Sequence, residues 1–182
     1  MNHDEVRASS VHLLAPTAEE LQRAAQQRHG RMVLIVFSGD FDRWMAAFSL
    51  ATTAAASGAQ VSMFFTFWGV LGLRRKRRYS GKSWLDRLLT MVLPAGCGRR
   101  VTRMNMGGMG APFFAHVMRR KNVASLEQLI DMAQQLGVKV TACQQSLLTM
   151  GVEADELIDG VEIGGAACAV DELQNDASTL FI

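Results

Sequence analysis

Short apolar runs alternate along the chain with segments whose apolar residues recur every three or four positions. This alternation is typical of an α/β protein. Residues 32–37 form a continuous apolar run between Gly30 and Ser38, which predicts a buried central strand. Residues 61–67 form a second run, and the segment between the two has the spacing of a helix that ends at Gly58. The order predicts a right-handed strand–helix–strand unit.

The second half of the chain continues the same alternation. Ser125 and Gln128 have the spacing of a capping box and predict a helix over 126–136. Three further strands are predicted, over residues 138–142, 161–163 and 178–182. Together these elements predict an α/β fold with a mainly parallel central sheet of about five strands.

The chain is expected to form one domain. Residues 1–15 have no long apolar run, so we expect a mobile tail rather than a secretory signal. No linker divides residues 16–182, which should fold as a unit with a basic, apolar insertion around 68–110. The apolar stretch 61–73 is shorter than the roughly 18 residues that a membrane span needs, so it predicts a strand followed by an exposed apolar loop.

Composition narrows the class of protein only slightly. The 182 residues are 49% hydrophobic and 20% charged, which is ordinary for a globular domain. The three cysteines, Cys97, Cys143 and Cys168, lie too far apart in sequence for a disulfide framework or a zinc signature. A reducing, cytoplasmic compartment is therefore expected, with no metal and no cofactor.

The small net charge of +2 hides a strong asymmetry along the chain. Residues 74–103 carry ten basic side chains and one acid, Asp86, whereas residues 151–182 carry eight acids and no Lys or Arg. The five consecutive basic residues, the basic segment, are Arg74, Arg75, Lys76, Arg77 and Arg78. We expect this segment to be exposed and to contact an acidic partner, the acidic end of the chain or the inner face of an anionic membrane. No nucleic-acid motif accompanies it.

Cys143 is the strongest candidate for chemistry. It follows the strand over 138–142 and precedes a helix predicted from Gln144, so it lies at the strand end where ligands collect in open α/β sheets. The free N–H groups of the helix favour a thiolate, but by only about 0.3–1 kcal/mol. A reactive Cys143 should therefore need a nearby cation, and the 74–103 region of the same or a neighbouring subunit is the candidate. The alternative is a buried thiol that only fills space.

Four residues are candidates to support Cys143. Ser146 stands where a CxxC motif would place its second cysteine, which disfavours dithiol chemistry, and its hydroxyl can hydrogen-bond a thiolate. Gln144 opens the helix beside the thiol. Gly39 and Asp40 follow the strand over 32–37, so they should lie at the same edge of the sheet.

Other motifs carry weaker signals. Cys97 lies in an irregular stretch close to three arginines, which makes it a possible second thiol or an incidental one. The sequence Gly81-Lys82-Ser83 resembles the end of a phosphate-binding loop, but Lys76 stands where that loop needs a glycine, so a turn before a helix over 84–92 is predicted. Cys168 lies among alanines and is expected to be packed.

Several blocks resemble the DsrE/DsrF-like family. They are residues 64–69 (FFTFWG), 105–110 (NMGGMG), 122–126 (NVASL), 136–146 (LGVKVTACQQS), 150–151 (MG) and 156–161 (ELIDGV). The resemblance covers residues 31–182 and implies a compact three-layer α/β/α fold, flavodoxin-like or DsrEFH-like, with a sulfur-relay role. It further implies that Cys143 carries sulfur as a persulfide, that the subunits form closed homo-oligomers, and that the partners are rhodanese-like and TusA-like proteins.

Two classes of function follow. The first is a sulfur carrier, or a persulfide-forming sulfurtransferase, that acts through Cys143 and passes sulfur to partner proteins. The second is a non-catalytic binding or regulatory module of flavodoxin-like shape. It would act through the basic, apolar segment, with peripheral membrane contact, and its Cys143 would be inert.

Overall fold

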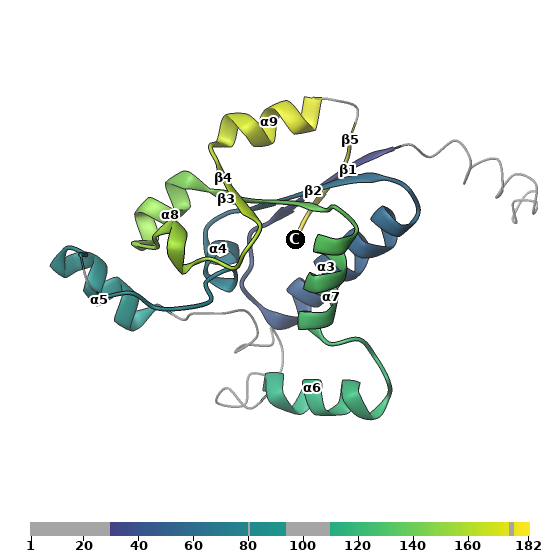
Figure 1. Cartoon of the computed structure of the whole chain (residues 1–182), viewed down its shortest axis with the longest axis horizontal. Helices are drawn as coiled ribbons and strands as arrows, with labels where there is room; N and C mark the ends of the chain where they lie inside the picture. The colour runs from purple at the N-terminus through teal and green to yellow at the C-terminus, as the bar shows by residue number, and fades with distance from the viewer. Residues whose placement is uncertain (1–29, 80, 94–109, 175–176) are drawn as a thin grey trace, which may run out of the picture.

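A computed structural model describes residues 30–79, 81–93, 110–174 and 177–182. Its centre is a five-stranded sheet in the order β4-β3-β2-β1-β5, in which every pairing is parallel (Figure 1). The strands are β1 Arg31–Val36, β2 Gln60–Phe65, β3 Lys139–Cys143, β4 Val161–Gly164 and β5 Ala177–Phe181. The predicted sheet is confirmed. The expected N-terminal tail and Cys97 lie outside the described residues.

Helices cover both faces of the sheet. They are α3 Phe41–Ala56, α4 Trp68–Gly72, α5 Trp84–Val92, α6 Gly110–Arg120, α7 Leu126–Gln135, α8 Gln144–Met150 and α9 Ala166–Gln174, with a 3₁₀ turn, η2, at Ala154–Glu156. Helices α3 and α7 lie on one side of the sheet and α9 on the other (Figure 1). The capping box that Ser125 and Gln128 predict is present at the start of α7. None of the described helices is long and apolar enough to cross a membrane.

The main core lies between the sheet and α3. The rings of Trp44 and Phe48 on α3 pack against Phe65 at the end of β2, with the Trp44 and Phe65 ring centres 4.9 Å apart. Trp44 also donates from its indole N–H to the carbonyl of Ser38, over 2.9 Å. This bond ties α3 to the chain that leaves β1 and so fixes the edge of the sheet where the strands end.

The expectation of an exposed apolar loop after β2 is wrong. Phe67 and Trp68 are each half exposed, but the rest of α4 is buried. The backbone turns sharply at Phe67, whose φ of 46° is unusual for a residue with a side chain. The turn brings the N–H of Gly69 to the carbonyl of Phe37, 2.8 Å away, so α4 lies over the carboxyl end of β1. Gly69 leaves no room for a Cβ there, which explains the glycine.

Candidate active site

Cys143 ends β3 and caps the N-terminus of α8, as the sequence predicts. It pairs in register with Gly164 of β4, and its side chain is only 5% exposed. The residue packs in a small cluster with Phe64 and Ala169. This cluster is separate from the main core, so Cys143 belongs to the side of the sheet that α9 covers.

Hydroxyl groups from two elements approach the thiol. Ser146 is buried on the first turn of α8, and its Oγ lies 3.1 Å from Oγ1 of Thr66, which directly follows β2. Burial raises the pKa of the Cys143 thiol, but hydrogen bonds outweigh it. They come from the Ser146 hydroxyl and N–H, the Thr66 hydroxyl and the Gln145 N–H, and the net result is a lowered pKa. The site therefore favours an anionic sulfur.

Hydrogen bonds from the described residues lower the pKa of Cys143. A hydrogen bond to a charged group contributes about 1.5–3 kcal/mol, compared with about 0.3–1 kcal/mol for a helix terminus. Two hydroxyls and two backbone N–H groups contribute here, and the cation expected from the 74–103 region stays a prediction, because residues 94–103 lie outside the described residues. Thr66 was missed because the sequence alone does not say that β2 neighbours β3. The predicted second strand also ran to residue 67, so Thr66 was placed inside that strand and not at its end.

The other supporting candidates lie at different distances from the thiol. Gln144 is adjacent in sequence and exposed. Gly39 and Asp40 follow β1, which lies two strands away from β3. The Asp40 carboxylate accepts a hydrogen bond from the Ser38 hydroxyl over 3.0 Å. A Cβ on Gly39 would lie 2.8 Å from the carbonyl oxygen of Trp68, so Gly39 supports the loop that carries Thr66.

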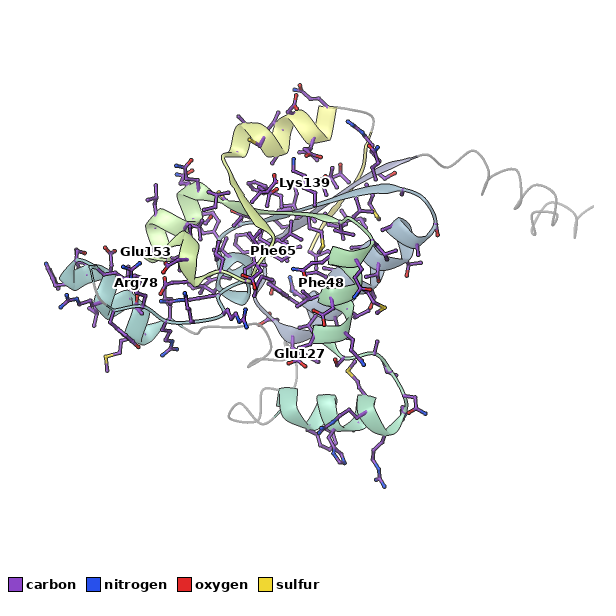
Figure 2. All side chains as sticks on the ribbon, viewed as in Figure 1. Phe48, Phe65, Arg78, Glu127, Lys139 and Glu153 are labelled. Atoms are coloured by element: carbon purple, nitrogen blue, oxygen red, sulfur yellow. The ribbon has the colours of Figure 1, made fainter. Side chains whose placement is uncertain are left out.

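The basic segment is not uniformly exposed, and the expectation is wrong for Arg74. Its side chain is buried, and its Nη2 lies 2.7 Å from Oε1 of Glu156, which is fully buried. Arg75, Lys76 and Arg78 are exposed, but each forms an ion pair with the acidic loop around η2. Figure 2 labels Arg78 and Glu153 of this contact. The opposite charges predicted from the sequence therefore meet within one chain.

Lys82 completes the buried charge cluster. Its Nζ lies 2.7 Å from Oε2 of Glu156 and 3.3 Å from the buried hydroxyl of Thr90. Burial raises the pKa of the Glu156 carboxyl, but the hydrogen bonds from Lys82 and Arg74 bring it down to about 2. The turn and helix predicted at 81–92 are confirmed, with Ser83 capping α5. The structural role of Lys82 was missed, because its partner lies 74 residues further along the chain.

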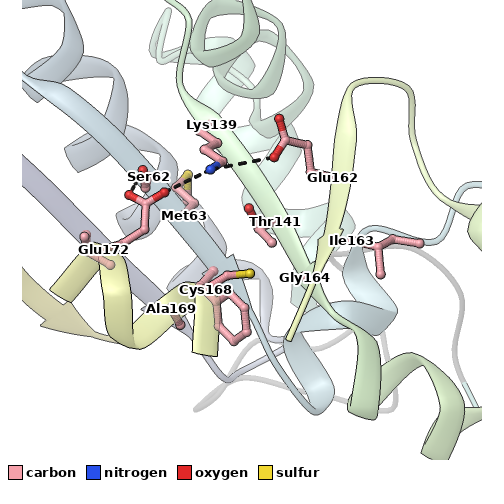
Figure 3. A pocket seen from close by; sticks show the side chains of 12 residues that line it. Ser62, Met63, Lys139, Thr141, Glu162, Ile163, Gly164, Cys168, Ala169 and Glu172 are labelled. Carbon is pink, nitrogen blue, oxygen red and sulfur yellow. Dashed lines mark hydrogen bonds and ion pairs between the residues drawn. The ribbon is translucent and has the colours of Figure 1, made fainter. Parts of the chain in front are cut away.

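The expectation that Cys168 is packed is wrong, because its side chain is exposed. It lines a cavity of about 60 Å³ between α9 and the strands, together with Ser62, Lys139 and Glu172 (Figure 3). The Lys139 ammonium lies 3.0 Å from Glu172 and 3.7 Å from Glu162. The described residues include no group of three side chains that could hold a metal ion.

Comparison with known proteins decides the family. The model of the DsrE/DsrF/DrsH-like family matches residues 28–181. The chain belongs to this family. It is 36% identical over 154 residues to the uncharacterised protein YrkE of Bacillus subtilis, covering 84% of this chain and 96% of YrkE. It is 33% identical over 142 residues to the sulfur carrier protein DsrE2 of Allochromatium vinosum, covering 75% of this chain and 88% of DsrE2.

A solved structure supports the fold assignment. MTH1491 from Methanobacterium thermoautotrophicum, a protein of unknown function, superimposes with a TM-score of 0.52 at 16% identity. The match covers 84% of this chain and 99% of that one. The three-layer DsrE-like architecture expected from the sequence is therefore confirmed.

Proposed function

We propose that this DsrE-family protein is a sulfur carrier that holds sulfur as a persulfide on Cys143. The observation that carries the proposal is the position of the buried Cys143 thiol at the end of β3 and the start of α8, where Ser146, Thr66 and Gln145 lower its pKa. Those donors favour a thiolate before loading and a persulfide anion after it. The name of the relative DsrE2, a sulfur carrier protein, supports the same conclusion.

The loading step needs no cofactor. The Cys143 thiolate attacks the outer sulfur of a donor persulfide, R–S–SH, forming a new S–S bond to that sulfur. The S–S bond of the donor breaks, and its electron pair leaves on the R–S⁻ thiolate. No net oxidation or reduction occurs. Rhodanese-like and TusA-like proteins are the proposed partners, because both classes would exchange sulfur through cysteine thiols in this way.

Ser146 separates this function from dithiol chemistry. It occupies the position at which a CxxC motif would carry its resolving cysteine, and a hydroxyl cannot form a disulfide. The side chain instead lies beside the thiol as a hydrogen-bond donor. A carrier or a sulfurtransferase fits this arrangement, and a disulfide oxidoreductase acting through residues 143 and 146 does not.

Mass spectrometry tests the proposal directly. The reduced protein is incubated with sodium polysulfide without oxygen, alkylated and digested. We expect Cys143 to gain the mass of one sulfur atom. Cys143→Ser should remove that adduct without changing the fold, since the exchange is nearly isosteric, whereas the matched variant Cys97→Ser should keep it. Sulfur found on Cys97 alone, with Cys143 unmodified, would contradict the proposal.

The exposed apolar face of α5 favours a second, additional function. Trp84, Leu85, Leu88, Met91 and Val92 are each more than half exposed, and the charged side chains of the basic segment lie nearby in sequence. Apolar residues on one side of a helix beside clustered basic residues are typical of peripheral membrane contact. We propose that α5 attaches the carrier to an anionic membrane surface. A homo-oligomer, which the family resemblance implies, would bury the same apolar face of α5 and so compete with the membrane for it.

Flotation with liposomes distinguishes membrane attachment through α5 from a subunit contact through α5. Binding to anionic vesicles should fall in Trp84→Ser and as salt rises above about 0.15 M, where screening shortens the range of charge attraction. Leu148→Ser is the matched control, because Leu148 is equally exposed on α8. If light scattering instead shows that Trp84→Ser dissociates an oligomer while vesicles never bind, α5 is a subunit contact and the membrane proposal is wrong.

A further inference from the structure

The burial of Cys143 poses a problem for a carrier that must pass sulfur to another protein. Its side chain is 5% exposed, whereas a partner thiol has to reach the persulfide in line with the S–S bond that breaks. Cys168 on α9 is exposed. The two cysteines are 25 positions apart in sequence, so their spatial relationship is visible only in the fold.

Gly164 is a neighbour of both cysteines. Gly164 on β4 is the register partner of Cys143 on β3, and neighbouring strands lie about 4.8 Å apart. A Cβ on Gly164 would lie 3.4 Å from Cβ and 3.5 Å from Sγ of Cys168. Cys168 therefore occupies the space above the backbone residue that is paired with Cys143.

Both cysteines belong to the same side of the sheet. Ala169, the residue after Cys168, packs in one cluster with Cys143 and Phe64. A Cβ on Gly164 would also meet the methyl group of Thr141, and Thr141 and Cys143 share one face of β3 because they are two residues apart. The close view shows Cys168 directed from α9 toward the strands that carry Thr141 and Gly164 (Figure 3).

We propose that Cys168 is a second sulfur-carrying thiol, which takes the outer sulfur from Cys143 and presents it at the surface. The inference rests on the proposed function of Cys143. The Cys168 thiolate attacks the outer sulfur of the Cys143 persulfide, Cys143–S–SH, and forms a new S–S bond. The old S–S bond breaks, its electron pair leaves on the Cys143 sulfur, and no net oxidation occurs. The products are Cys168–S–SH and the Cys143 thiolate.

The surroundings of each thiol favour sulfur transfer from Cys143 to Cys168. A thiol with a lower pKa is a better leaving group, and the hydrogen bonds from Ser146 and Thr66 stabilise the departing Cys143 thiolate. On the receiving side, Lys139 lines the same cavity as Cys168 and places an ammonium group beside it. The cavity of about 60 Å³ has room for one added sulfur atom.

A chase experiment on the Cys97→Ser protein tests the transfer. The protein is loaded with sodium polysulfide, freed of donor by rapid desalting, and alkylated at intervals before peptide mapping. We expect the persulfide on Cys143 to decline while that on Cys168 rises. The first-order rate constant should be the same when the protein is diluted tenfold. Three results would each overturn the proposal. They are persulfide amounts on Cys143 and Cys168 that do not change with time, transfer from Cys168 to Cys143, and a rate constant that scales with protein concentration.

Two glycine variants make the geometry part of the test. Gly164→Ala adds a methyl group 2.9 Å from the Thr141 methyl and 3.5 Å from Sγ of Cys168, so the packing around Cys168 has to shift. The chase should slow about tenfold, since small displacements of reacting atoms are costly. Gly165→Ala is the matched control, because its Cβ would meet nothing within 4 Å, and it should keep the original rate. Equal slowing in both variants would argue against a path over Gly164. If Cys143 takes up no sulfur at all, the proposed function fails, and that result is distinct from loading without transfer.

Discussion

The backbone N–H of Phe67 donates a hydrogen bond to Oγ of Ser146, with the two atoms 2.9 Å apart. The bond joins the loop after β2 to the first turn of α8 and helps to hold Phe67 at its positive φ. It also orients the serine hydroxyl. Because Oγ already accepts from Phe67, the hydroxyl proton points away from that N–H, toward the Thr66 hydroxyl or the sulfur of Cys143.

The first prediction is that Ser146→Ala raises the pKa of Cys143 by about one unit or more, because a hydrogen bond to a charged group contributes about 1.5–3 kcal/mol. Thiolate absorbance against pH measures the change in the Cys97→Ser, Cys168→Ser background. Gln144→Ala is the control, since that side chain is exposed, and it should leave the pKa in place. If the pKa of Cys143 is the same in Ser146→Ala as in the wild type, Ser146 does not stabilise the thiolate.

The second prediction concerns the rate at which Cys143 loads. Because the thiolate is the nucleophile, the rate should rise with pH and level off above the pKa of Cys143. The pKa of Cys143 is lowered from the ordinary thiol value of 9.0 in the folded protein, so the midpoint of the rise should lie below that of an ordinary thiol. Stopped-flow loading with polysulfide at a series of pH values gives the midpoint. A midpoint at or above the ordinary value would contradict the hydrogen-bond account.

The third prediction is that Glu156→Gln destabilises the fold by about 3–5 kcal/mol, because it leaves Arg74 and Lys82 buried without their carboxylate. Asp159→Asn is the matched control. It breaks the exposed pair with Arg75 and should cost about 0–1 kcal/mol. Urea unfolding of both variants measures the difference, and similar losses would show that burial of the cluster does not matter.

A fourth prediction follows from the pKa of Glu156, which is about 2 in the fold and 4.5 for an ordinary glutamate. The folded carboxyl binds its proton less readily than the unfolded one. Its contribution to stability is therefore complete above an ordinary glutamate pKa and is lost as the pH falls toward 2. The difference in unfolding free energy between wild type and Glu156→Gln should shrink over this acidic window. A constant difference would mean that Glu156 does not titrate there.

The fifth prediction concerns the packing of α4 on α3. A Cβ on Gly72 would lie 2.2 Å from the Trp44 ring, so Gly72→Ala should destabilise the protein by at least about 1–3 kcal/mol, as overpacking does. Gly30→Ala should cost little, because nothing lies within 4 Å of its Cβ. Thermal unfolding compares the two variants. Equal melting temperatures would show that the ring can move aside.

The elements that could be predicted were those with local signals. The apolar run before Ser38, the capping box at Ser125 and the helix over 84–92 each depend on residues close together in sequence, and each is confirmed. The position of Cys143 at a strand end also follows from its neighbours. The order of the five described strands places Thr66 beside Cys143, which no local pattern encodes.

The features that could not be predicted depend on distant partners. Arg74 is indistinguishable in sequence from the exposed residues that follow it, and it is buried only because Glu156, 82 positions away, lies beneath it. Cys168 sits among alanines that suit either a packed or an exposed helix face, and its exposure depends on how α9 crosses the sheet. Long-range pairing decides both cases, so their burial could be learned only from the fold.

The pairing of β5 with β1 has a consequence for biosynthesis. β1 is the first strand of the described chain to leave the ribosome, yet one of its two neighbours, β5, is the last to be made. Until β5 arrives, that side of β1 presents unpaired backbone N–H and C=O groups flanked by Val33, Leu34 and Val36. The nascent protein therefore has an unpaired, aggregation-prone strand edge for most of its synthesis. Chaperone binding to ribosome-bound chains should map to residues 31–36 and end once β5 has emerged.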